Sequence, residues 1–118
     1  MIYGITHDDS LVPQIQKNME ATSRFSLETL DHLCCGNLGR LDIQLEYAVR
    51  MENSTLDSVR RDAAFVVQRY EANENFHLFA DTPSKVFCPG LFAGAAGIGY
   101  ALLRLSSPGT LPCLLAFE

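Results

Sequence analysis

Apolar residues recur every three or four positions along most of this chain, the spacing of one-sided helices. One such stripe covers residues 9–20, a second covers residues 36–53 and a third covers residues 55–75. The apolar positions of the three stripes are Leu11, Ile15, Met19, Leu38, Leu41, Leu45, Ala48, Val49, Leu56, Val59, Ala63, Val66 and Tyr70. No segment alternates convincingly between apolar and polar residues, which would indicate a half-buried strand. The pattern therefore predicts an all-α protein.

Local signals set the limits of the predicted helices. Ser10 is a candidate N-cap for the first helix, with Pro13 in its opening turn. A shorter helical pattern occupies residues 21–35. In the helix over residues 55–75, charged side chains including Arg69 lie opposite the apolar stripe, so we expect that side to face solvent.

The last third of the chain is predicted to form a loop followed by a buried helix. Residues 72–90 mix Asn, Asp, Pro and Gly with aromatics such as Phe76 and Phe87, which favours a loop that packs through its aromatic rings. Residues 91–105 are apolar on nearly all sides, so the helix that they predict is buried on several sides. Pro108 stops it.

A pair of glycines opens two of these helices. Gly36 and Gly39 start one helix, and Gly94 and Gly97 start another at a distance of 58 residues. Two glycines three positions apart lie on one face of a helical turn, where a neighbouring backbone can come close. We interpret the four as structural glycines in two repeats, each with an outer and an inner helix. Coincidence in a chain with eight glycines is the alternative.

Composition and charge exclude several classes of protein. With 118 residues, 47% of them apolar, the chain can form one folded domain over residues 1–118 and is not a disordered tail. Its net charge of −5 provides no basic field for nucleic acid. The uncharged stretch at residues 86–103 contains Pro89 and four glycines, so no membrane span is predicted. The N-terminus lacks a signal-peptide pattern and cysteines are few, which favours a cytoplasmic location.

Two adjacent cysteines, Cys34 and Cys35, directly precede a predicted helix start. A thiolate is a ligand for Zn²⁺, and a helix start lowers the pKa of a thiol through its free N–H groups and its dipole. The usual zinc spacing is C-x-x-C, so metal binding and buried thiols both remain open for this pair. Cys88 and Cys113 lie in apolar settings and are predicted to be buried free thiols. His32 is near enough to support the pair, although packing is the simpler role.

Two separated motifs resemble the C-terminal end of a LanC-like lanthionine cyclase. The first motif is Leu33-Cys34-Cys35-Gly36-Asn37-Leu38-Gly39 with Leu41-Asp42. The second motif is Pro89-Gly90-Leu91-Phe92-x-Gly94-x-Ala96-Gly97-Ile98-Gly99-Tyr100-x-Leu102-Leu103-Arg104-Leu105 with Pro108. The resemblance covers roughly residues 30–118, and its most similar form is the cyclase domain of class II lanthipeptide synthetases, the LanM type. The resemblance implies an α/α toroid, of which this chain would form the terminal helical repeats in an incomplete ring.

The resemblance also implies a zinc site. Members of the family hold a catalytic Zn²⁺ with two cysteines and a histidine. Cys34 matches a cysteine of this set and Cys35 stands at the histidine position, as in a subset of the family with an all-sulfur site. A third thiolate adds one negative charge to the site, so a substrate thiolate bound there should be more nucleophilic. The first zinc cysteine and the acid/base residues of the family lie upstream of the matched segment, so the resemblance implies no catalytic residue here and an incomplete zinc site.

The implied reaction adds a peptide cysteine to dehydroalanine or dehydrobutyrine and forms a thioether ring. The partners would be a dehydrated lanthipeptide precursor and the missing N-terminal part of the synthetase. We expect this chain to be a C-terminal fragment that is incomplete on its own. The alternative is a non-catalytic helical remnant or interaction module that has lost the reaction. A small redox or metal-buffering protein that uses the cysteine pair is a third hypothesis.

Overall fold

The computed structural model describes residues 6–51, 55–79 and 87–116. Within these ranges the chain is helical and contains no strand. The helices are α2 (Val12–Ser23), α3 (Asn37–Arg50), α4 (Leu56–Asn73) and α5 (Ala95–Ser106), with short 3-10 helices η1 (Asp9–Leu11) and η2 (Leu114–Ala116). The prediction of an all-α protein is confirmed.

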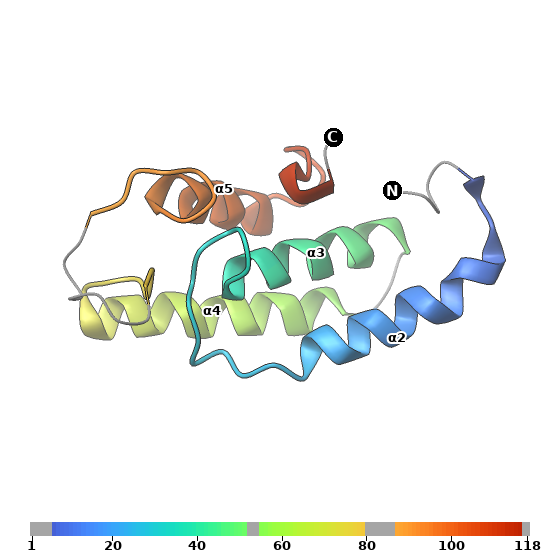
Figure 1. Ribbon diagram of the computed structural model, residues 1–118, viewed down its shortest axis with the longest axis horizontal. Coiled ribbons are helices and arrows are strands. Elements are labelled where there is room, and N and C mark those ends of the chain that lie inside the picture. Colours follow the sequence, from blue (N-terminus) through green and yellow to red (C-terminus); the bar gives the residue numbers. More distant parts are fainter. Residues whose placement is uncertain (1–5, 52–54, 80–86, 117–118) are drawn as a thin grey trace.

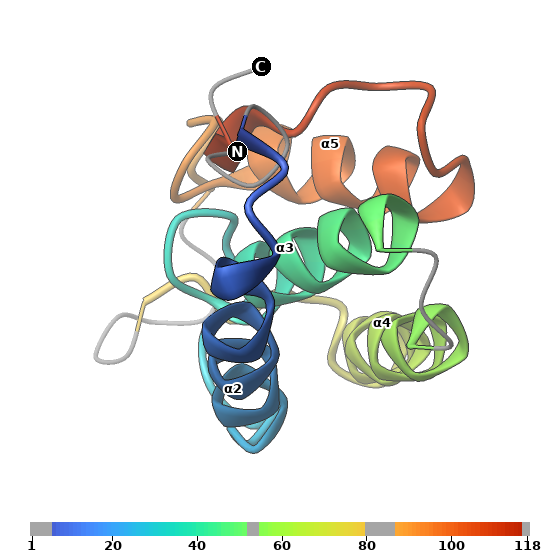
Figure 2. The same ribbon diagram turned by 90° about the vertical axis from the view of Figure 1, so that its right-hand side faces the viewer.

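Helix α3 lies at the centre of the molecule. It packs against α4 and α5, and α4 makes a smaller contact with α5. Seen end-on, α2 and α4 lie on one side of α3 and α5 lies on the other (Figure 2). If α2 and α4 are taken as one helical layer and α3 and α5 as the other, the chain passes twice from the first layer to the second, as the predicted repeats require (Figure 1). This arrangement is consistent with a fragment of a helical toroid.

The core is formed by the apolar stripes of α3 and α4 and the adjoining face of α5. Its buried residues are Leu33, Leu38, Leu41, Leu45, Val59, Ala63, Val66, Ile98, Ala101 and Leu105. The periodicity predicted most of these positions correctly in α3 and α4. The last apolar positions of the two stripes, Val49 and Tyr70, are instead exposed. Both lie toward the ends of their helices, where fewer neighbours cover the side chains.

The start of the first helix differs from the prediction. Ser10 is not the N-cap of α2, because α2 begins at Val12 and Leu11 caps it without a side-chain hydrogen bond. Asp8 caps the short helix η1 instead, since its carboxylate accepts the Ser10 N–H at 3.0 Å. An aspartate two residues earlier therefore takes the role that was expected of the serine.

The predicted helical pattern over residues 21–35 is wrong beyond Ser23, where α2 ends. The Asn37 side chain binds the carbonyl oxygens of Leu27 and Thr29 at 2.8 and 3.2 Å. The Asn37 backbone N–H binds the carbonyl of Leu30 at 2.7 Å. Three carbonyls of this segment are therefore occupied by one residue from the next helix, which holds the segment as a series of turns.

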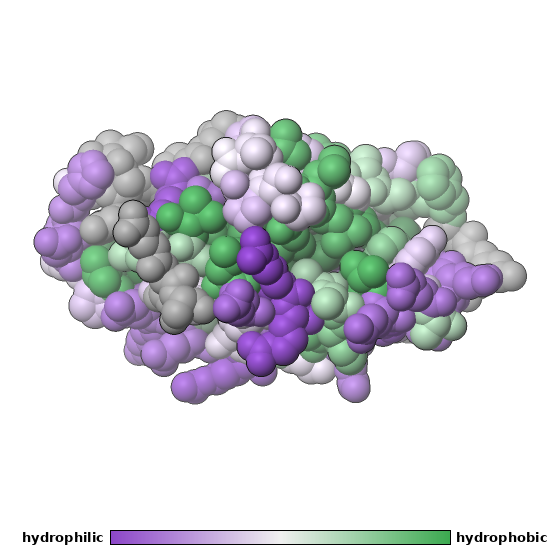
Figure 3. Space-filling model, turned by 180° about the vertical axis from the view of Figure 1, so that it is seen from behind, coloured by the Kyte–Doolittle hydropathy of each residue, from purple (hydrophilic) through white to green (hydrophobic). Residues whose placement is uncertain are grey.

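Helix α5 is less enclosed than its composition predicts. Its face toward α3 is buried, but Ala95, Ala96, Gly99 and Leu103 are exposed, and Leu103 is 61% exposed. In the rear view, hydrophobic residues run across the middle of the molecule and toward its upper right, and hydrophilic residues lie to their left and below them (Figure 3). Phe87, in the segment that leads to this helix, is 78% exposed, so its predicted packing is also wrong. No helix in the described ranges has the length and apolarity needed to cross a membrane.

The two glycine-started segments have the same backbone geometry. The Asn37 N–H binds the Leu30 carbonyl at 2.7 Å, and the Ala95 N–H binds the Cys88 carbonyl at 2.8 Å. The donor residue and the acceptor residue of the second bond each lie 58 positions after the corresponding residue of the first bond. The predicted repeat is therefore confirmed by a turn of the same form at the start of α3 and at the start of α5.

Close backbone approaches explain the second glycine of each repeat. A Cβ atom on Gly39 would lie 2.0 Å from the carbonyl oxygen of Leu33. A Cβ atom on Gly97 would lie 1.7 Å from the carbonyl oxygen of Leu91. Heavy atoms cannot approach this closely, so the turn and the helix can pack in this way only when the helix residue has no side chain.

A buried ion-pair network joins the C-terminal segment to α3. Arg104 is 3% exposed and pairs with Asp42, which is fully buried, and with Glu46 at 2.6 Å. The Arg104 Nε–H also donates to the carbonyl of Leu111 at 3.1 Å. The Cys113 thiol donates to Asp42 at 3.4 Å. These contacts hold the segment after α5 against the central helix.

The network shifts the pKa values of its two carboxyl groups in opposite directions. Burial raises the pKa of Asp42, although the charge of Arg104 works against this effect. Burial also opposes ionisation of Glu46, but its hydrogen bonds to Arg50 and Arg104 and their charges outweigh burial and lower its pKa. Asp42 is therefore the member of the network that is harder to ionise.

Ionisation of the Cys113 thiol is expected to lower the stability of the protein in alkaline solution. Burial and the nearby charge of Asp42 raise its pKa above the usual value of 9.0. Above that pH the unfolded chain loses this proton first, so the free energy of unfolding must fall as the pH rises through the folded-state pKa. Chemical denaturation of wild type and Cys113→Ala between about pH 7 and 10 should show a steeper decline for wild type. Parallel declines would contradict this assignment.

Candidate metal centre

The cysteine pair lies in the turn that leads into α3. Cys34 and Cys35 are both exposed and are not joined in a disulfide. The first two backbone N–H groups of α3 are not free to stabilise a thiolate. The Asn37 and Leu38 N–H groups donate to carbonyls of the preceding turn, at 2.7 and 3.4 Å. The expected lowering of the thiol pKa is wrong for Cys35. Slight desolvation of its thiol, together with the neighbouring Cys34 thiol, raises the pKa of Cys35 instead.

The second repeat supports this turn directly. The Cys34 N–H donates to the carbonyl of Phe92 at 2.8 Å, and Phe92 is the residue at the matching position of the second turn. The Cys35 N–H donates to Nδ1 of His32 at 3.4 Å, and the Gly36 N–H donates to the His32 carbonyl at 3.1 Å. His32 is itself buried, so it supports the backbone of the pair from beneath.

The other two cysteines differ in accessibility. Cys113 is a buried free thiol, as predicted. Cys88 is also free, but it is partly exposed, so its predicted burial is wrong. It lies at the start of the second turn, where its carbonyl accepts the Ala95 N–H.

Three buried or half-buried polar side chains surround the base of the cysteine turn. Asp31 and Asn37 are at most 1% exposed, and the Asn37 amide donates to the Asp31 carboxylate at 2.8 Å. Arg69 reaches across from α4 and pairs with the same carboxylate. The prediction that Arg69 faces solvent is therefore wrong. Periodicity correctly placed Arg69 on the side of α4 opposite the apolar stripe. That side is not open to solvent at Arg69, because the segment that precedes the cysteines packs against it.

A family model described as lanthionine synthetase C-like protein matches residues 2–116. The chain belongs to this family. Comparisons with curated proteins and with solved structures found no match. The family match covers both glycine-started repeats and the cysteine turn.

The lanthionine synthetase C-like chain offers two soft donors for a metal ion at this turn. Cys34 and Cys35 are adjacent and exposed, and thiolates are preferred ligands of Zn²⁺. In the ranges that the structure covers, no group of three or more His, Cys, Asp or Glu side chains could hold a metal. His32 Nδ1 already accepts a backbone N–H, so this nitrogen is occupied. The residues therefore fit part of a zinc site, namely two ligands of the four that zinc normally takes.

The network of Asp31, Asn37 and Arg69 is the part of the site that sequence reasoning missed. One signal was present, because a polar residue stands three positions before Cys34 and another stands two positions after Cys35. No local pattern indicated that an arginine 38 residues after Asp31 would pair with it.

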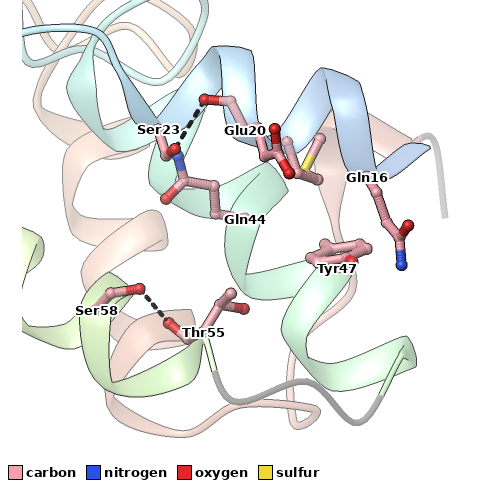
Figure 4. A pocket seen from close by; sticks show the side chains of 8 residues that line it. Gln16, Glu20, Ser23, Gln44, Tyr47, Thr55 and Ser58 are labelled. Atoms are coloured by element: carbon pink, nitrogen blue, oxygen red, sulfur yellow. Dashed lines mark hydrogen bonds between the residues drawn. The ribbon is translucent and has the colours of Figure 1, made fainter. Parts of the chain in front are cut away.

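A cavity of about 420 Å³ lies on another side of the molecule. Its walls come from α2, α3 and the start of α4, as Figure 4 shows for Gln16, Tyr47 and Ser58. Among its described lining residues there is neither a cysteine nor a histidine. It is therefore separate from the cysteine turn, and its composition indicates no chemistry.

Proposed function

We propose that this chain forms the zinc-bearing C-terminal part of a lanthionine cyclase of the class II, LanM type, and that it works in the cytoplasm. The substrate would be a dehydrated precursor peptide, whose cysteine thiols add to dehydroalanine or dehydrobutyrine. The observation that carries the proposal is the exposed pair Cys34 and Cys35 at the start of α3, in a chain of the lanthionine synthetase C-like family. Another polypeptide segment would provide the remaining protein ligand and the acid/base groups.

The roles of this chain in the reaction are binding and orientation. Cys34 and Cys35 would hold the ion at the mouth of the turn, and Phe92 and His32 would fix the backbone from which both thiols project. A bound Zn²⁺ lowers the pKa of an incoming thiol, so that the thiol can react near neutral pH. Because both ligands of this chain are sulfur, they donate more negative charge to the ion than a cysteine and a histidine would.

Metal content is the direct test. We expect the chain, purified with the missing part of a class II cyclase domain, to hold about one zinc per complex, the occupancy of a single site. Elemental analysis should show that Cys34→Ser and Cys35→Ser each lose most of this zinc, because either change removes a ligand. Cys88→Ser is the matched control and should keep it, since Cys88 belongs to another turn.

Ring formation provides the second measurement. Thioether formation joins sulfur to the β-carbon and moves the thiol proton to the α-carbon, so the mass of the peptide does not change. Alkylation of free thiols before mass spectrometry separates cyclised from linear peptide. We expect cyclisation with wild type and its loss in Cys35→Ser. A complex that cyclises the peptide with neither cysteine present would overturn the proposal.

A non-catalytic helical module is the second candidate. It is favoured by the incomplete donor set, because only two candidate ligands meet at the turn in the described ranges. In that case neither zinc nor cyclisation would depend on Cys34 or Cys35, and the complex would hold no metal at this turn. The zinc measurement therefore separates the two candidates.

A further inference from the structure

A buried hydrogen bond closes the base of the cysteine turn. The Asn37 amide donates to Oδ1 of Asp31 at 2.8 Å, and both side chains are almost fully buried. Asp31 lies three residues before Cys34, and Asn37 lies two residues after Cys35. The bond therefore joins the two ends of a seven-residue segment that has both thiols at its outer side.

The layer formed by α4 anchors the same carboxylate. Arg69 of α4 pairs with Oδ1 of Asp31. The backbone N–H of His77, just beyond α4, donates to Oδ2 at 2.8 Å, and the Asp31 N–H donates to the His77 carbonyl at 2.6 Å. Because a buried carboxylate is costly unless it is paired, each of these donors helps to stabilise Asp31 in this position.

We propose that Asp31, Asn37 and Arg69 are positioning residues that hold Cys34 and Cys35 as a preformed chelating pair. They act through the backbone of the turn, which they close at its base and fasten to α4. A turn already in the binding conformation loses less entropy when two sulfurs bind one atom. The role in zinc binding rests on the proposed function, but the geometry of the two thiols can be tested without zinc.

Phenylarsine oxide is the probe, because one trivalent arsenic binds two neighbouring thiols. The two S–H bonds and the As=O bond are replaced by two As–S bonds and one molecule of water, so nothing is oxidised or reduced. Cys34→Ser should abolish this chelation by the pair. Arg69→Gln should weaken the binding of the arsenical about tenfold or more, the scale seen when residues that support metal ligands are removed. Arg60→Gln, an exposed arginine on the same helix, should leave binding unchanged.

A second readout separates positioning from general unfolding. The rates at which Cys34 and Cys35 react with a monofunctional maleimide should stay within about twofold of wild type in Arg69→Gln, because each thiol is already exposed. If Arg69→Gln loses its helical circular dichroism, Arg69→Lys replaces it. The lysine keeps the charge but not the two-pronged donor, so an intermediate loss of arsenical affinity is expected.

Three outcomes overturn the inference. The first is a folded Arg69→Gln or Arg69→Lys with wild-type arsenical affinity. The second is wild-type protein that does not chelate the arsenical. The third is zinc affinity that is equal in wild type and Arg69→Gln, which leaves the proposed function intact. Conversely, a chain that binds no zinc but loses arsenical affinity in Arg69→Gln supports the positioning role while the proposed function fails.

Discussion

Gly97→Ala is expected to destabilise this protein by more than about 3 kcal/mol, beyond the usual range for an overpacked site. The new Cβ would lie 1.7 Å from the Leu91 carbonyl oxygen and 3.0 Å from the Leu33 Cβ. The turn cannot retreat cheaply, because the Ala95 N–H and the Cys34 N–H both bind its carbonyls. Urea denaturation followed by circular dichroism measures the loss, which is a large share of the roughly 5–15 kcal/mol that stabilises a domain.

Gly99→Ala is the matched control in the same helix. A Cβ atom at Gly99 meets nothing within 4 Å. Alanine restricts the unfolded chain more than glycine does, so this change should stabilise the protein by about 0.5–1 kcal/mol. Equal stability of Gly97→Ala and Gly99→Ala would show that the close approach to Leu91 does not constrain the fold.

Arg104→Met is expected to cost about 3–5 kcal/mol, the usual effect of removing one partner from a buried ion pair. The change leaves the carboxylate of Asp42 fully buried without its cation. It also removes a donor to the Leu111 carbonyl, so the segment after α5 should become more sensitive to protease. Denaturant unfolding and limited proteolysis measure the two effects.

An exposed ion pair provides the contrast. Arg24 lies 3.9 Å from Glu20 on the surface of α2, and both side chains are more than 70% exposed. Arg24→Met should therefore change the free energy of unfolding by about 1 kcal/mol or less. Adding Asp42→Leu to Arg104→Met should recover part of the lost stability, because the uncompensated charge disappears. A double variant no more stable than Arg104→Met alone would contradict this explanation.

Local patterns were sufficient for much of the fold. The stripes through Leu41 and Val59 predicted α3 and α4, because helical periodicity depends on residues only a few positions apart. The glycine spacing predicted the repeat, and the close approaches at Gly39 and Gly97 supply its physical reason. The adjacency of Cys34 and Cys35 made them candidate ligands before any geometry was known.

Other features depended on residues that meet only after folding. The turn before α3 reads as a helix locally, but Asn37 takes the carbonyls that a helix there would use. The Asp31 pair with Arg69 spans 38 residues, and the Asp42 pair with Arg104 spans 62. Such pairings depend on how the two helical layers pack, which periodicity along one helix does not specify. Residue types alone thus indicated which side chains are candidate metal ligands, whereas long-range packing decided which charged groups pair with the residues that flank them.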